Sequence, residues 1–171
     1  MSPGGQPLAS FTDRLLAYLI DYAIITGVMI ILAIPAGVVF FVVVGPDLFE
    51  VQPDGTPATP DFLEFFVPLL LIDLAVIVAT MVVAYLYEVE MMFRSGQTLG
   101  KRAMKIKVTP VDPAGALNRG MAARRWLVDR VAVMFLPGFL YVDGLWQLWD
   151  KPHQQCLHDK FAKTVVVKVP A

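Results

Sequence analysis

The chain has 171 residues, of which 57% are hydrophobic, and its mean hydropathy of +0.63 exceeds what a soluble domain of this size carries. Composition therefore argues against a water-soluble globular protein. The formal net charge of −1 gives no general support to nucleic-acid binding. Because Cys156 is the only cysteine, no disulfide can form within the chain.

Basic residues are absent from a long part of the sequence. Each of the fourteen Lys and Arg residues is either Arg14 or lies at Arg94 and beyond. The intervening residues 15–44 and 62–93 are largely apolar. Each segment is longer than the roughly 20 residues that a helix needs to cross about 30 Å of hydrocarbon. We therefore predict an integral membrane protein with two full transmembrane helices.

The two connecting segments carry opposite charges. Residues 45–61 contain acids, prolines and glycines but no Lys or Arg, which predicts a mobile, non-helical loop on the outer face. Residues 94–125 carry eight basic residues against the single acid Asp112. By the positive-inside rule this segment is cytoplasmic, and the N-terminus with Arg14 then lies on the same side.

Residues 126–149 form a third hydrophobic segment, interrupted by Pro137 and Gly138 and containing Asp129, Arg130 and Asp143. It fits either a third span or a re-entrant or interfacial hairpin whose arms are each about 16 Å long. A third span would place the lysine-rich tail, residues 150–171, outside. We therefore favour the hairpin.

Two short segments have strand character. Residues 105–109 alternate in a period of two, residues 164–169 are rich in β-branched side chains, and residues 112–115 have turn chemistry. If both segments are cytoplasmic, they can pair. The expected fold is mainly α: one polytopic membrane domain with two full helices, a third hydrophobic segment and a small cytoplasmic strand pair.

Arg14 and Asp21 are seven residues apart, so they lie within about 20° of each other on one helix face, with Asp21 roughly 10 Å deeper. Intramembrane acids usually face the bundle interior and mark ion, proton or substrate paths. The alternative is structural. Arg14 would then pair with Glu88 or Glu90, and Asp21 would bind backbone or hydroxyl groups.

Asp73 falls near the middle of the second predicted helix. If it approaches Asp21, the two carboxylates would share a proton or hold a monovalent cation, because two like charges in a low dielectric raise one pKa strongly. Alternatively, Asp73 pairs with Arg130 of the third segment or contacts a partner protein.

The segment 95–102 resembles a phosphate-binding loop only superficially, because its glycine spacing is one residue short and Arg102 replaces the required hydroxyl. We interpret it as a turn that begins a basic juxtamembrane element. Such an element attracts anionic lipid headgroups. The basic cytoplasmic layer consists of Lys101, Arg102, Lys105, Arg124 and Arg125.

His153, Cys156 and His158 have no further ligand residues at metal-type spacing, so we expect neither a metal site nor a cofactor. No set of nucleophile, base and orienting residue is recognisable either. An enzyme is therefore not expected.

Three sequence blocks together resemble the RDD family of small bacterial membrane proteins. They are residues 11–21, with Phe11-Thr-Asp-Arg14 and Leu19-Ile-Asp21; residues 96–108, beginning Gly-Gln-Thr-Leu-Gly-Lys-Arg; and residues 157–166, beginning Leu-His-Asp-Lys. The resemblance assigns the family's Arg to Arg14 and its two Asp residues to Asp21 and Asp159. Asp73 is then an addition of this sequence, as are Asp129 and Asp143 in the third segment.

The resemblance implies a multi-pass protein of the bacterial plasma membrane without a shared catalytic activity, and cation/proton antiport is proposed for some family members. Two spans are few for an aqueous path, so transport would require a homo-oligomer or another subunit. The alternative function is that of a non-catalytic accessory or assembly subunit of a larger membrane complex.

Overall fold

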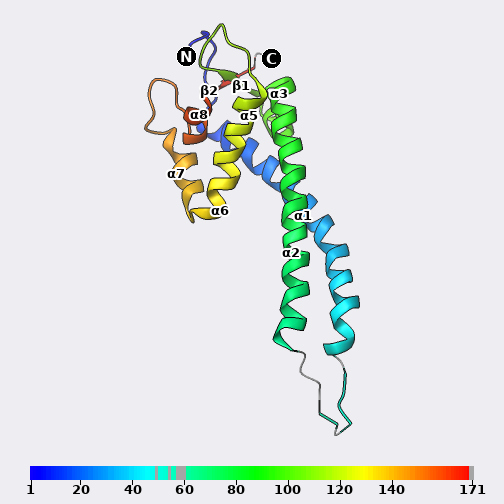
Figure 1. Ribbon diagram of the computed structural model, residues 1–171. Coiled ribbons are helices and arrows are strands. Elements are labelled where there is room, and N and C mark those ends of the chain that lie inside the picture. Colours follow the sequence, from blue (N-terminus) through cyan, green and yellow to red (C-terminus); the bar gives the residue numbers. More distant parts are fainter. Residues whose placement is uncertain (49, 54, 57–60, 170–171) are drawn as a thin grey trace. The chain divides into compact units, whose positions relative to one another are not determined.

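The computed structural model describes residues 1–48, 50–53, 55–56 and 61–169 (Figure 1). The chain divides into two compact units. The first unit comprises Met1–Ala23 and Ala84–Ala171, and the second unit comprises Ile24–Val83. The long helix α1 (Phe11–Leu48) begins in the first unit and continues into the second.

The second unit consists of the remainder of α1 and most of α2 (Phe62–Tyr85), and an edge-to-face contact between Phe40 and Phe65 at 5.6 Å joins the two helices. The helical stretches Phe11–Pro46 and Phe62–Ser95 are long and apolar enough to cross a membrane. In each stretch, only 6% of an apolar 18-residue segment is buried, whereas the core helix of a soluble protein would be mostly buried. The two predicted spans are thus present as helices with apolar surfaces.

Helix α1 is longer than predicted. It continues through Gly45 and Pro46 to Leu48, so the first four residues of the expected non-helical connector are helical. Pro46 lies in the last turn of the helix. Its missing N–H removes one intrahelical hydrogen bond, that to the Val42 carbonyl, and only two helical residues follow it. Within the predicted outer loop, residues 49, 54 and 57–60 lie outside the described residues.

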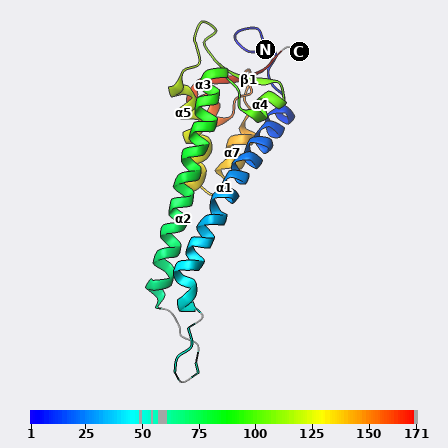
Figure 2. The same cartoon turned by 90° about the vertical axis from the view of Figure 1, so that its right-hand side faces the viewer.

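Beyond α2, the helix continues through the π-helical segment η1 (Leu86–Glu90) into α3 (Met91–Ser95). Gly96 ends it in the left-handed conformation (φ 73°), with its N–H donating to the Met92 carbonyl at 2.7 Å. The next helix, α4 (Leu99–Ala103), lies against the first turns of α1 (Figure 2). The predicted turn at the start of the basic element is therefore present.

The third hydrophobic segment folds as a broken helix. The first arm runs through α5 (Arg119–Trp126), η2 (Leu127–Ala132) and α6 (Val133–Phe135), and the second arm is α7 (Phe139–Trp146). The break falls at Pro137 and Gly138, as predicted, and α7 packs back against η2. Because the chain reverses here, these residues have the geometry of a hairpin. Whether the hairpin enters the bilayer stays a prediction.

The predicted strand pair is present as an antiparallel sheet of β1 (Ile106–Pro110) and β2 (Thr164–Lys168). Val108 is paired with Val166, and Leu8 near the N-terminus forms a bridge to Val167. The N-terminal segment therefore lies beside the C-terminal strand of this sheet (Figure 1). The predicted turn after β1 closes through the Gly115 N–H, which donates to the Asp112 carbonyl at 3.0 Å.

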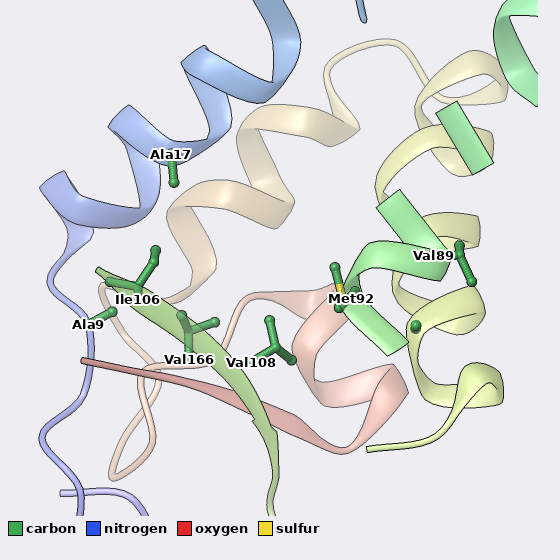
Figure 3. Close-up of a cluster of buried hydrophobic side chains, with 8 residues drawn as sticks. Ala9, Ala17, Val89, Met92, Ile106, Val108 and Val166 are labelled. Atoms are coloured by element: carbon green, nitrogen blue, oxygen red, sulfur yellow. The ribbon is translucent and has the colours of Figure 1, made fainter. Parts of the chain in front are cut away.

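One face of the sheet contributes to a small buried core (Figure 3). Ile106 and Val108 of β1 and Val166 of β2 point toward Met92 and Ala17, and all five side chains are buried. The alternation of buried Ile106 and Val108 with exposed Lys107 is the period of two that predicted β1.

Replacing Gly138 tests the hairpin turn. Gly138 has φ 83°, where a Cβ is strained, so Gly138→Ala should lower the free energy of unfolding by about 1–2 kcal/mol. The measurement is thermal unfolding of the detergent-solubilised protein followed by circular dichroism. Gly144→Ala is the matched control, because Gly144 lies inside α7 and its added Cβ would meet nothing within 4 Å. Equal destabilisation by both substitutions would contradict the turn.

Candidate functional site

Asp21 lies in a buried polar pocket of the first unit, with 3% of its surface exposed. Tyr87 Oη donates to Asp21 Oδ1 at 2.6 Å, Thr98 Oγ1 donates to Oδ2 at 2.5 Å, and the Gly100 N–H donates to Oδ1 at 2.9 Å. Lys101 Nζ lies 3.6 Å from Oδ2. The carboxylate therefore has its hydrogen-bonding capacity largely satisfied and its charge matched.

The glycine-rich block positions these partners. Thr98 is the N-cap of α4 and accepts a hydrogen bond from the Lys101 N–H. A Cβ on Gly100 would lie 2.2 Å from the carbonyl oxygen of Ala17 and 2.9 Å from the Asp21 carboxylate. Only glycine permits this approach, so the spacing of Gly96 and Gly100 reflects one left-handed cap and one close backbone contact.

The basic layer predicted from the sequence divides into two groups. Arg102, Lys105 and Arg124 are exposed, whereas the half-buried Lys101 and the buried Arg125 form ion pairs with buried carboxylates. Burial lowers the pKa of the Lys101 ammonium group, and the neighbouring Asp21 carboxylate opposes that shift. Only the exposed group can act as a headgroup-binding surface.

Asp159 is fully buried and accepts hydrogen bonds from two arginines. Arg14 Nη1 donates to Oδ2 at 3.0 Å, and Arg125 Nη1 forms a close ion pair with Oδ1. Arg125 Nη1 also donates to Thr164 Oγ1 at 2.7 Å, and the Cys156 N–H donates to Asp159 Oδ2 at 3.1 Å. One carboxylate thus joins α1, α5 and β2 to α8 (Leu157–Ala162).

Burial determines the ionisation of two groups near Asp159. Burial lowers the pKa of Arg125 to about 10, which still leaves the guanidinium charged at neutral pH. Burial also raises the pKa of the Cys156 thiol to about 11, although Arg14 and Arg125 act in the opposite direction. Cys156 is therefore a neutral thiol at neutral pH.

The two π-helical segments hold a second buried ion pair. Arg130 of η2 donates to both carboxylate oxygens of Glu88 in η1, at 3.0 and 2.5 Å. Glu90 pairs instead with Arg119, at 2.6 and 3.1 Å. The pairing of Arg14 with Glu88 or Glu90 that we considered from the sequence is therefore wrong. Arg130 is bound to Glu88, and its pairing with Asp73 of the second unit stays a prediction.

Asp143 and His158 form a third pair, which sequence reasoning missed. Asp143 is 1% exposed and accepts the His158 N–H at 2.8 Å, while its other oxygen lies 2.5 Å from His158 Nδ1. Nearby Asp129 accepts no hydrogen bond from the described residues, and its nearest charged partner is Arg130 Nε at 4.0 Å. The only sequence signal was the presence of Asp129 and Asp143 in an apolar segment.

A cavity of about 350 Å³ lies in the first unit among these charged groups. Apolar side chains of α1 and α7, including Leu15 and Leu145, form much of its wall. The charged lining comprises Arg14, Glu88, Lys101, Arg125, Asp129, Asp143 and Asp159, together with His158. The volume is at the lower end of the range for small-molecule sites, which is about 300–1,000 Å³.

Asp73 lies in the second unit on an exposed part of α2. The described part of the chain gives its carboxylate no hydrogen bond and no ion pair. All the polar partners of Asp21 belong to the first unit. The shared Asp21 and Asp73 ion site therefore stays a prediction.

The sequence pattern of the RDD family matches residues 8–163, which is most of the chain. The chain belongs to the RDD family. Its proteins are membrane proteins, in agreement with the two long apolar helices. No curated protein and no solved structure shows significant similarity to the chain.

The residues that carried the RDD resemblance lie in the two buried networks of the first unit. Arg14 and Asp159 bind each other directly, and Asp21 holds the glycine-rich block against α1. In this RDD protein the three residues connect segments that are far apart in sequence. These contacts are the kind that the structural alternative for Asp21 predicts, and an ion or proton path through Asp21 stays a prediction.

Removing the charge of Asp159 tests the structural role of these contacts. Asp159→Asn keeps an acceptor for the Cys156 N–H but leaves two buried guanidinium groups without a counterion, so it should lower the free energy of unfolding by about 3–5 kcal/mol. Thermal unfolding in detergent measures the loss. Asp112→Asn is the control, because Asp112 is exposed and asparagine preserves its turn. A melting temperature equal to that of the wild type would contradict the structural role.

Proposed function

We propose that this RDD protein is a non-catalytic accessory or assembly subunit of a larger complex in the bacterial plasma membrane. The observation that carries the proposal is the exposed carboxylate of Asp73 in an apolar helix, which none of the described residues pairs with. Leu70 and Leu74 beside it are 67% and 53% exposed. The apolar surface around the carboxylate is thus available to another helix.

An ionised aspartate facing lipid near mid-bilayer is unfavourable by about 2.5–3.5 kcal/mol on insertion scales. The chain has no Lys or Arg between Arg14 and Arg94, so a second copy would bring no basic side chain from the corresponding membrane segment. A partner helix with a Lys, Arg or His at the same depth would neutralise Asp73. The negative charge of Asp73 therefore favours binding to a different protein over self-association.

The state of Asp21 supports the same function. A carrier residue must exchange its proton or ion during each cycle, whereas Asp21 accepts three hydrogen bonds and faces Lys101 in a buried pocket. Freeing the Asp21 carboxylate from these hydrogen bonds would break the contact between α1 and α4. A scaffold with fixed buried ion pairs and an exposed intramembrane acid suits assembly better than transport.

The proposed topology follows the charges. The N-terminus and the first unit's basic residues lie in the cytoplasm, and the exposed Arg102, Lys105 and Arg124 contact anionic headgroups. The apolar tip of the hairpin, where Phe135 is 76% and Tyr141 is 71% exposed, enters the cytoplasmic leaflet.

Site-specific photocrosslinking in cells tests the docking face. A crosslinking residue in place of Leu70, about 60° from Asp73 around the helix, should capture one stoichiometric membrane partner, whereas the same residue in place of Leu71, about 160° away, should not. Asp73→Asn should reduce the Leu70 crosslink at least tenfold, since loss of a desolvated charge pair exceeds about 1.4 kcal/mol. Glu64→Gln, in the first turn of α2, is the matched control. Undiminished crosslinking with Asp73→Asn would contradict the proposal.

Cation or proton transport by an oligomer is the second candidate function, and the observation in its favour is the same intramembrane acid at position 73. Reconstitution into liposomes distinguishes the two functions. We expect imposed Na⁺, K⁺ and pH gradients to drive no ion flux above that of protein-free vesicles. A flux that Asp73→Asn or Asp21→Asn abolishes would establish transport and overturn the accessory role.

A further inference from the structure

Three residues from different elements of the first unit converge on one side of the cavity. Asp129 belongs to η2, Asp143 to α7 and His158 to α8. Each offers one ligand atom, and these atoms all lie within 4.8 Å of one another. All three residues line the cavity of about 350 Å³, so an ion can reach them.

We propose that Asp129, Asp143 and His158 bind a divalent transition-metal ion such as Zn²⁺. One imidazole and two carboxylates form a ligand set that such ions accept, whereas Mg²⁺ and Ca²⁺ prefer oxygen ligands alone. This site goes beyond the proposed accessory function and is independent of Asp73. It also departs from the sequence-based expectation of no metal site, which considered only the tail residues.

Asp129 is the residue that points to a missing ligand. Its side chain is 20% exposed, and its carboxylate accepts no hydrogen bond within the described residues. The neighbouring acids are satisfied differently: Glu88 has a two-pronged bond to Arg130, and Asp159 is shared by two arginines. Among these acids, Asp129 is therefore the one whose carboxylate has unsatisfied hydrogen-bonding capacity within the described residues.

The Asp143 and His158 pair is already oriented for coordination. The His158 backbone N–H fixes Asp143 Oδ1 at 2.8 Å, which holds α8 against α7. Carboxylates and imidazoles that bind metals are commonly oriented by such additional hydrogen bonds. Ligands of a tetrahedral Zn²⁺ ion lie about 3.3–3.5 Å apart, so Asp143 Oδ2 and His158 Nδ1, which are 2.5 Å apart as a hydrogen-bonded pair, would separate by roughly 1 Å around the ion. The Asp129 carboxylate would approach them, since no hydrogen bond from the described residues holds it back.

Charge at the three residues favours a cation. With a neutral imidazole they carry two negative charges, and the nearest basic groups bind other carboxylates more closely, with Arg130 Nε 4.0 Å from Asp129. Arg130 is bound to Glu88, and Arg125 is bound to Asp159. The alternative set of Cys156, His158 and Asp159 is a poorer site, because Asp159 is neutralised by two arginines and Cys156 is buried.

The test is Zn²⁺ binding to the full-length protein, purified in detergent and stripped with a chelator. Isothermal titration should show one Zn²⁺ per chain, and Co²⁺ should give the visible absorption bands of a low-coordinate site. Asp129→Asn and His158→Gln should each weaken binding at least tenfold. Zn²⁺ should also raise the melting temperature of the wild type, because the ion joins three elements, and it should not raise that of Asp129→Asn.

The chain offers a matched control in His153→Gln, which removes its other histidine and should leave the affinity unchanged. Asp129→Asn breaks no hydrogen bond among the described residues, so it should fold even if His158→Gln does not. Absence of saturable Zn²⁺ binding by the wild type would overturn the proposal. Unchanged affinity in Asp129→Asn, or a loss confined to His153→Gln, would also overturn it.

Discussion

The buried carboxylate of Asp159 is the interaction on which the first unit depends. It binds Arg14 at the start of α1 and Arg125 at the end of α5, and Arg125 reaches Thr164 at the start of β2. Two guanidinium groups around one carboxylate are tolerable away from water only while all three charges remain together. The network therefore makes the fold of the helices, the hairpin and the sheet mutually dependent.

The acidic residues discussed above fall into two groups, which differ in how many hydrogen bonds and ion pairs their carboxylates form. Asp21, Glu88 and Asp159 are buried and fully bonded, which is the usual state of polar groups inside a folded protein. Asp73 and Asp129 are less covered and accept no hydrogen bonds from the described residues. An apolar environment makes such carboxylates unfavourable unless something from outside the chain binds them. The two proposals, a partner helix and a metal ion, follow from that difference.

Much of the architecture could be predicted from the sequence because its causes are local. The lengths of the apolar stretches predicted the two long helices, and the period of two predicted β1. Pro137 and Gly138 predicted the break in the third segment. The helix end at Leu48 was missed, because Pro46 removes a single intrahelical hydrogen bond without ending α1. The RDD family was also recognisable, since its motif residues form three compact blocks of sequence.

The ion pairs could not be predicted, and the reason is physical. Arg14 and Asp159 are 145 residues apart, and many acids and bases compete for the same partners, so the choice depends on long-range packing. The π-helical turns shift the faces on which Glu88 and Arg130 lie, which an α-helical period does not anticipate. Sequence alone thus determined the hydrophobic spans, the strands and the segregation of charge. Tertiary structure alone decided which charges meet, which acids accept no hydrogen bond from the described residues, and where the cavity lies, because those outcomes depend on side chains brought together by folding.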